Sequence, residues 1–107
     1  MKIPGLKAIK AGGADTADKI VDIVGGRGAD CAVETSGAAA AQRNAVLCLK
    51  PRGKASFVGL KDPGDDTPTI CVEDIIHFEK TLYGSKVLSK AHYEELMDFM
   101  IGHGLHF

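Results

Sequence analysis

Apolar residues repeat with helical spacing in three parts of the chain. After the N-cap candidate Asp15 they stand at i, i+3, i+4 and i+7, which predicts a helix that ends at Gly25-Gly26. A second helix is predicted over residues 38–49. A third is predicted after Ser89, and we interpret its apolar face as core packing; this face consists of Tyr93, Leu96, Met97, Met100 and Ile101.

Shorter apolar runs between these helices predict strands. The run Cys31-Ala32-Val33 has small and β-branched residues, which suit a strand that is buried on both faces. Residues 54–60 and 81–85 predict two further strands, a turn is predicted at residues 51–53, and residues 69–72 have the pattern of a short outlying strand. The alternation of strands and helices predicts an α/β fold: a parallel sheet of about three strands with flanking helices.

Length and charge narrow the class of protein. The chain has 107 residues, enough for one small domain, and its net charge of −1 gives no basic patch for nucleic acid. We therefore expect no nucleic acid as partner. No apolar run reaches membrane-spanning length, so we expect no membrane as partner either. Cys31 and Cys48 lie in apolar surroundings, which predicts buried thiols and a reducing, cytoplasmic location.

Polar residues and glycines gather where the predicted strands end. Glu34-Thr35-Ser36-Gly37 follows the first strand; Ser36 is a candidate helix N-cap and Gly37 permits close approach of backbone or ligand. Gly59 and Gly84 stand at the corresponding ends of the other two strands. Any one of these glycines alone is a turn residue, but together they predict a ligand cleft, because parallel sheets bind ligands at this edge. For Glu34 we favour a solvated strand end over a pocket acid.

Four segments in order resemble one known family. They are Gly-Gly-Arg-Gly-Ala-Asp at 25–30, Val-Glu-Thr-Ser-Gly at 33–37, Arg-Gly-Lys at 52–54 leading to Val58-Gly59, and Lys-Thr-Leu-Tyr-Gly-Ser at 80–85. They resemble the cofactor-binding domain of medium-chain dehydrogenases, the zinc-dependent alcohol dehydrogenase family. The resemblance implies a partial Rossmann-like fold, the second mononucleotide-binding half, over residues 14–104. Residues 1–13 are expected to be a remnant helix or a disordered start, and residues 105–107 a tail.

The resemblance also implies a binding site for NAD or NADP, weak or partial in this chain. It places the cofactor's nicotinamide-side ribose and carboxamide against three segments. These are Thr35, Ser36 and Gly37; Val58, Gly59 and Leu60; and Gly84, Ser85 and Lys86. We expect valine at Gly59 to abolish this binding while leaving the fold intact.

Other parts of the family pattern are missing. The sequence contains no G-x-G-x-x-G phosphate loop and no Cys/His/Glu zinc set, so the zinc of the parent family has no ligands here and no residue is a catalytic candidate. His103 and His106 are expected to be exposed terminal residues. The isolated chain is therefore expected to be inactive, although the parent enzyme would move hydride between NAD(P) and an alcohol or carbonyl substrate.

A second interpretation belongs to another class of protein. The chain could be a non-catalytic α/β module for oligomerisation or weak nucleotide binding. In either case we expect a homo-oligomer that forms through an exposed sheet edge, because a short sheet leaves backbone groups unpaired. The two candidate edges are residues 31–35 and residues 69–72.

Overall fold

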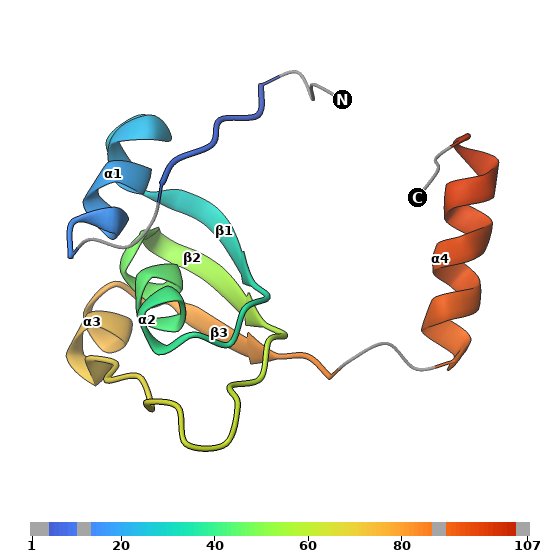
Figure 1. Ribbon diagram of the computed structural model, residues 1–107. Coiled ribbons are helices and arrows are strands. Elements are labelled where there is room, and N and C mark those ends of the chain that lie inside the picture. The colour runs from blue at the N-terminus through green and yellow to red at the C-terminus, as the bar shows by residue number, and fades with distance from the viewer. Residues whose placement is uncertain (1–4, 11–13, 87–89, 105–107) are drawn as a thin grey trace.

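The computed structural model describes residues 5–10, 14–86 and 90–104. Three strands, β1 (Ala29–Glu34), β2 (Leu49–Phe57) and β3 (Thr81–Gly84), form one parallel sheet in the order β1-β2-β3 (Figure 1). The helices are α1 (Thr16–Ile23), α2 (Ala39–Leu47), α3 (Val72–His77) and α4 (Lys90–Gly102). The predicted α/β class and three-stranded parallel sheet are confirmed.

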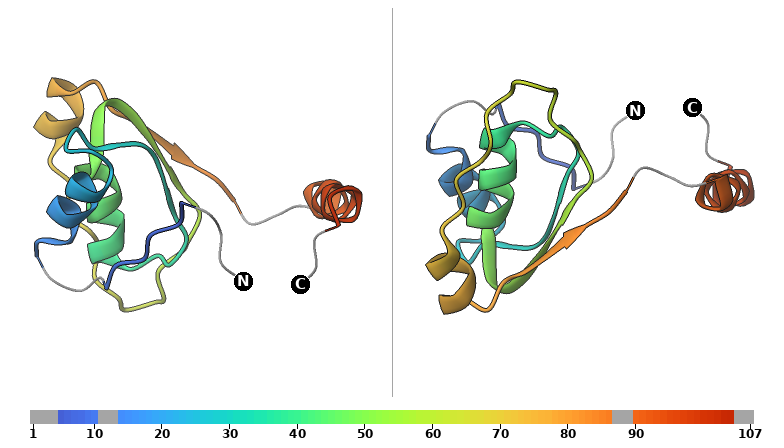
Figure 2. Two further views of the ribbon diagram at one scale, coloured as in Figure 1. Left: turned by 90° about the horizontal axis from the view of Figure 1, so that it is seen from above. Right: turned by 90° about the horizontal axis from the view of Figure 1, so that it is seen from below.

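The core lies between the sheet and α2. Helix α2 packs on β1 and β2, and α1 packs against α2 on the same side of the sheet (Figure 2). In the register of the sheet, Ala32 pairs with Ala55 and Ala55 with Leu82, and Ala55 is fully buried. Small side chains in this row allow α2 to approach the strands closely. The buried apolar residues are Ala17, Ala45, Val46, Cys48, Leu49 and Ala55.

The other face of the sheet is open over β1 and β3. Val33 is 68% exposed and Tyr83 is 50% exposed, and the two lie in one row of the sheet with Ser56 between them. Cys31 is also exposed, whereas Cys48 is buried as predicted. The expectation that the first strand is buried on both faces is therefore wrong. The reason is that α2 packs against one face of β1, while the side chains of Cys31 and Val33 remain exposed among the described residues.

Helix α4 stands apart from the sheet (Figures 1 and 2). Tyr93 and Ile101 of the predicted apolar face are more than half exposed and Leu96 is also exposed, so the interpretation of this face as core packing is wrong. The predicted cap Ser89 and the tail residue His106 lie outside the described residues. His103 is exposed, as predicted, and its ring stacks on that of Phe99 with 4.2 Å between the centroids.

Several predicted boundaries differ from the structure. Helix α2 ends at Leu47 and β2 begins at Leu49, so the turn predicted at residues 51–53 lies inside a strand. It forms a bulge there: Ala29 pairs with Leu49 but Cys31 with Lys54, and the intervening Arg52 has a φ of 65°. Residues 69–71 form no strand, and Val72 already belongs to α3. Residues 5–10 form no helix.

Candidate functional site

The carboxyl ends of the three strands lie at one edge of the sheet, level with one another (Figure 1). Glu34 at the end of β1 pairs with Phe57 of β2, which pairs with Gly84 of β3. The residues that follow the three ends are therefore neighbours in space. The structure thus brings to one edge all nine residues that the sequence predicts as cofactor contacts, in the segments 35–37, 58–60 and 84–86.

The segments after β1 and β2 are in direct backbone contact. A Cβ atom added to Gly37, whose φ is +77°, would lie 2.3 Å from the carbonyl oxygen of Leu60. A Cβ atom added to Gly59 would lie 2.4 Å from the amide nitrogen of Gly37 and 2.5 Å from the carbonyl carbon of Thr35. Both glycines are needed because the two backbones meet. The expectation that valine at Gly59 leaves the fold intact is therefore wrong.

The end of β3 is more open. A Cβ atom added to Gly84 would have nothing within 4 Å, and Ser85 and Lys86 are both exposed. The Ser85 amide donates a hydrogen bond of 2.9 Å to the Phe57 carbonyl, which fixes this segment to the neighbouring strand. A hollow of about 330 Å³ opens between Gly84, Phe57 and Gln42 of α2. Gly84 is thus the strand-end glycine that leaves space for another molecule.

Glu34 lies beneath the turn that follows β1. It is only 5% exposed, and its carboxylate accepts hydrogen bonds from the Ser36 amide at 2.8 Å, the Ser36 hydroxyl at 2.5 Å and the Gly37 amide at 3.1 Å. The interpretation of Glu34 as a solvated strand end is wrong. Burial by itself would raise the pKa of Glu34, but the hydrogen bonds from Ser36 and Gly37 outweigh it and lower this pKa below its ordinary value of 4.5.

Ser36 completes this turn and does not cap the helix. The N-cap of α2 is Ala38, whose amide donates a 3.1 Å hydrogen bond to the Ser36 hydroxyl oxygen, while that hydroxyl donates to Glu34. One sequence signal was available for Glu34. An acidic residue followed two and three positions later by serine and glycine is placed to accept their backbone N–H groups.

Glu34 also contacts the second segment through its main chain. Its carbonyl oxygen accepts hydrogen bonds from the amides of Val58 at 2.9 Å and Gly59 at 3.2 Å. One residue therefore holds the segment after β1 with its side chain and the segment after β2 with its backbone. The N–H groups of Ser36, Gly37, Val58 and Gly59 all point to acceptors inside the protein.

The described residues do not fit the zinc site of a metal-dependent dehydrogenase. Within residues 5–10, 14–86 and 90–104, no group of three or more His, Cys, Asp or Glu side chains could hold a metal ion. The three strand-end segments themselves contain none of these residue types. None of the helices described in the structure is long and apolar enough to cross a membrane.

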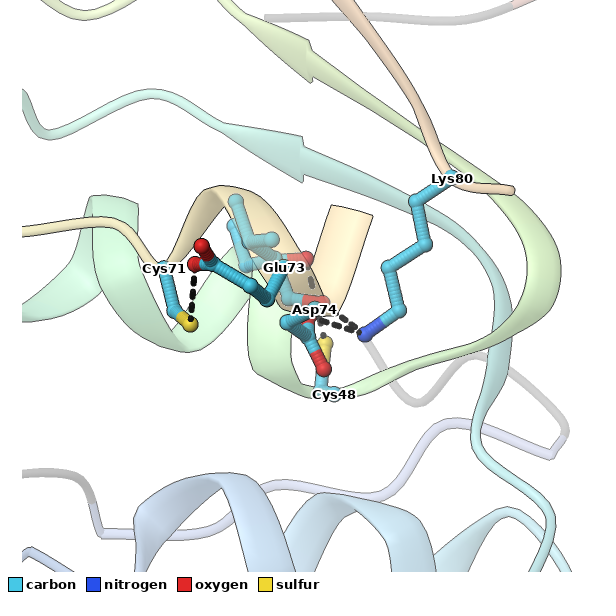
Figure 3. A network of polar contacts seen from close by, with 7 residues as sticks. Cys48, Cys71, Glu73, Asp74 and Lys80 are labelled. Atoms are coloured by element: carbon cyan, nitrogen blue, oxygen red, sulfur yellow. Dashed lines mark hydrogen bonds and ion pairs between the residues drawn. The ribbon is translucent and has the colours of Figure 1, made fainter. Parts of the chain in front are cut away.

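A second polar network lies at the opposite end of β3 (Figure 3). The Lys80 ammonium group donates to the Asp74 carboxylate of α3 at 2.8 Å and to the Val46 carbonyl of α2 at 2.9 Å. The Lys80 side chain is 3% exposed. Burial raises the pKa of the nearby Cys48 thiol. This network joins two helices to the start of a strand, so we assign it to stability rather than to ligand binding.

A parallel sheet with helices and a cluster of hydroxyl and glycine residues at its carboxyl edge is the arrangement of open α/β proteins, which bind ligands at the carboxyl ends of their strands. The family model described as zinc-binding dehydrogenase matches residues 6–102. The chain therefore belongs to the zinc-binding dehydrogenase family, as its sequence motifs indicated. No curated protein is a significant match to the sequence.

Several solved structures have a similar fold. AibC superposes with a TM-score of 0.76 at 23% identity, over 92% of this chain and 26% of that one. Benzyl alcohol dehydrogenase from Acinetobacter calcoaceticus gives a TM-score of 0.68 at 23% identity, over 84% and 25% of the two chains. An alcohol dehydrogenase zinc-binding domain protein from Burkholderia ambifaria gives a TM-score of 0.58 at 29% identity, over 67% of this chain and 19% of that one. The chain spans about a quarter of the length of the first two.

Proposed function

We propose that this chain forms the nicotinamide-side half of the cofactor-binding domain of an NAD(P)-dependent oxidoreductase. The observation that carries the proposal is the position of nine residues, in three segments, at one level edge of a parallel sheet. The family membership supports it, and one of the similar solved structures is described as an NAD-dependent alcohol dehydrogenase. The parent activity would be hydride transfer between the cofactor and an alcohol or carbonyl carbon.

In this proposal the chain binds and orients the cofactor and leaves the chemistry to other parts of an enzyme. The segment after β3 offers open space at Gly84 for the nicotinamide end, and the interlocked segments after β1 and β2 form a rigid floor beside it. Hydride transfer also needs a group that polarises the substrate, and the described residues supply no metal ligands for this. We therefore expect the purified chain alone to be inactive and to bind NADH only weakly.

The test is a titration of the isotope-labelled chain with NADH, followed by two-dimensional NMR. We expect chemical shift changes to concentrate in residues 84–86 and 58–60. Gly84→Val should abolish these changes without altering the melting temperature, because a Cβ atom at Gly84 meets nothing within 4 Å in the free protein. The matched control is Gly102→Val in α4, where a Cβ atom also meets nothing within 4 Å. Equal NADH binding by wild type and Gly84→Val would contradict the proposal.

The alternative function is that of a non-catalytic module that associates with further copies of itself. Strand β1 is an edge of the sheet, and beside it a hollow of about 480 Å³ is lined by Ile20, Val24 and Cys31. We propose that the chain forms a homo-oligomer through this edge, because of the two edges predicted from the sequence only residues 31–35 lie on an edge strand, whereas residues 69–71 form no strand. Sedimentation should show an oligomer that Ile70→Pro does not weaken; a monomer at high micromolar concentration would contradict this. The cytoplasmic location stays a prediction.

A further inference from the structure

The turn after β1 has the form of an anion-binding site that the protein fills with its own carboxylate. Successive backbone N–H groups that converge on one point attract phosphate or carboxylate groups. Here the amides of Ser36 and Gly37, together with the Ser36 hydroxyl, converge on the carboxylate of Glu34. Because Glu34 is 5% exposed and comes from the adjoining strand, this anion is a fixed part of the site.

The neighbouring segment offers no free donor for an anion either. The amides of Val58 and Gly59 both donate to the Glu34 carbonyl oxygen, at 2.9 Å and 3.2 Å. The floor formed by residues 35–37 and 58–59 therefore has the negative charge of the Glu34 carboxylate beneath the turn after β1. Four of its backbone N–H groups already donate to oxygen atoms of Glu34. A second anion brought to this floor would meet charge repulsion and no available N–H group from these four residues.

We propose that Glu34 is the residue that sets the ligand specificity of this floor: its carboxylate occupies the backbone donors of the turn after β1 and so excludes phosphate and carboxylate groups of a ligand from them. Glu34 acts through Ser36 and Gly37, so it is a positioning residue. The identity of the bound molecule as a nicotinamide cofactor rests on the proposed function, whereas the exclusion of anions does not.

The experiment compares wild type with Glu34→Ala and with the matched control Glu95→Ala, an exposed glutamate of α4. Inorganic phosphate, acetate and nicotinamide are titrated separately while NMR follows the Ser36 and Gly37 amides. In wild type and in Glu95→Ala we expect no shift of these amides with phosphate or acetate. In Glu34→Ala we expect both anions to give saturable shifts, and acetate to move the two amides back towards their wild-type positions. Nicotinamide should shift residues near the floor in wild type.

Two results would overturn the inference. One is a shift of the Ser36 and Gly37 amides by phosphate in wild type as large as in Glu34→Ala; the other is an absence of anion binding in folded Glu34→Ala. If Glu34→Ala does not fold, Glu34→Gln decides: its neutral side chain removes the charge repulsion, so phosphate and acetate should shift these two amides more than in wild type, and equal shifts would also overturn the inference. Failure of NADH to bind wild type would remove the proposed function but would leave these anion results unchanged.

Discussion

Loss of Asp74 should destabilise the protein far more than loss of Lys80, although the two form one ion pair (Figure 3). In this structure the Lys80 side chain is 3% exposed, and Asp74→Ala would leave its ammonium group with the Val46 carbonyl as hydrogen-bond acceptor and the Phe78 ring 5.5 Å away. Removing one partner of a buried pair costs about 3–5 kcal/mol, because an uncompensated charge remains in the interior. Since Asp74 is 18% exposed and the Val46 contact survives, we expect Asp74→Ala to lower the free energy of unfolding by about 3 kcal/mol, the lower end of this range.

Lys80→Met should cost less, about 1 kcal/mol, because the thioether fills the same space and no charge stays buried. The Asp74 carboxylate left behind can reach water. The double variant should be about as stable as Lys80→Met alone, which corresponds to a coupling of about 3 kcal/mol between the two residues. The control is Glu79→Gln, which breaks the 3.8 Å contact to Arg52; both side chains are at least 70% exposed, so we expect less than about 0.5 kcal/mol.

Urea unfolding followed by far-ultraviolet circular dichroism measures these differences as shifts of the transition midpoint at constant slope. The order of stability should be wild type and Glu79→Gln, then Lys80→Met and the double variant, then Asp74→Ala. A free energy of unfolding for Asp74→Ala equal to or above that of Lys80→Met would refute the reasoning. It would mean that the unpaired ammonium group reaches solvent.

Three further predictions concern the strand ends and the thiols. Gly59→Ala should lower the melting temperature strongly, whereas Gly84→Ala should leave it unchanged, because only the first added Cβ meets backbone atoms. Folding lowers the pKa of Glu34, so its contribution to stability is present above the ordinary value of 4.5 and is lost as pH falls; wild type should therefore lose more stability than Glu34→Gln between about pH 5 and about pH 3. Under native conditions a thiol reagent should modify two cysteines quickly and Cys48 only on unfolding. Rapid modification of all three would contradict the buried position of Cys48.

The sequence by itself determined the class of fold and the place of the candidate site. Helical spacing after Asp15 and the short β-branched runs follow directly from local geometry, because side chains repeat every 3.6 residues in helices and every two in strands. The strand-end glycines were also readable, since a parallel sheet brings all its carboxyl ends to one edge. For this reason all nine predicted contact residues lie together in the structure.

Only the tertiary structure decided which of these residues are exposed to a ligand and which are held by contacts within the protein. Glu34 looked like a solvated strand end, but the turn folds back so that Ser36 and Gly37 donate to its carboxylate. Gly59 was predicted as a ligand contact, and the structure adds a second requirement for glycine there, because the backbone of the neighbouring segment leaves no space for a side chain. Both outcomes depend on how closely two separate segments approach, and residue types along one segment carry no information about that distance.

The apolar surfaces show the same limit. Periodicity identified the apolar positions of β1 and α4, yet Val33 is 68% exposed and Ile101 is 73% exposed. An apolar stripe indicates which face of an element favours burial, but burial itself requires a second surface at packing distance. In this chain α2 supplies that surface for one face of β1, and α4 lies away from the sheet. The sequence sets what each element would bury, and the three-dimensional arrangement sets what it does bury.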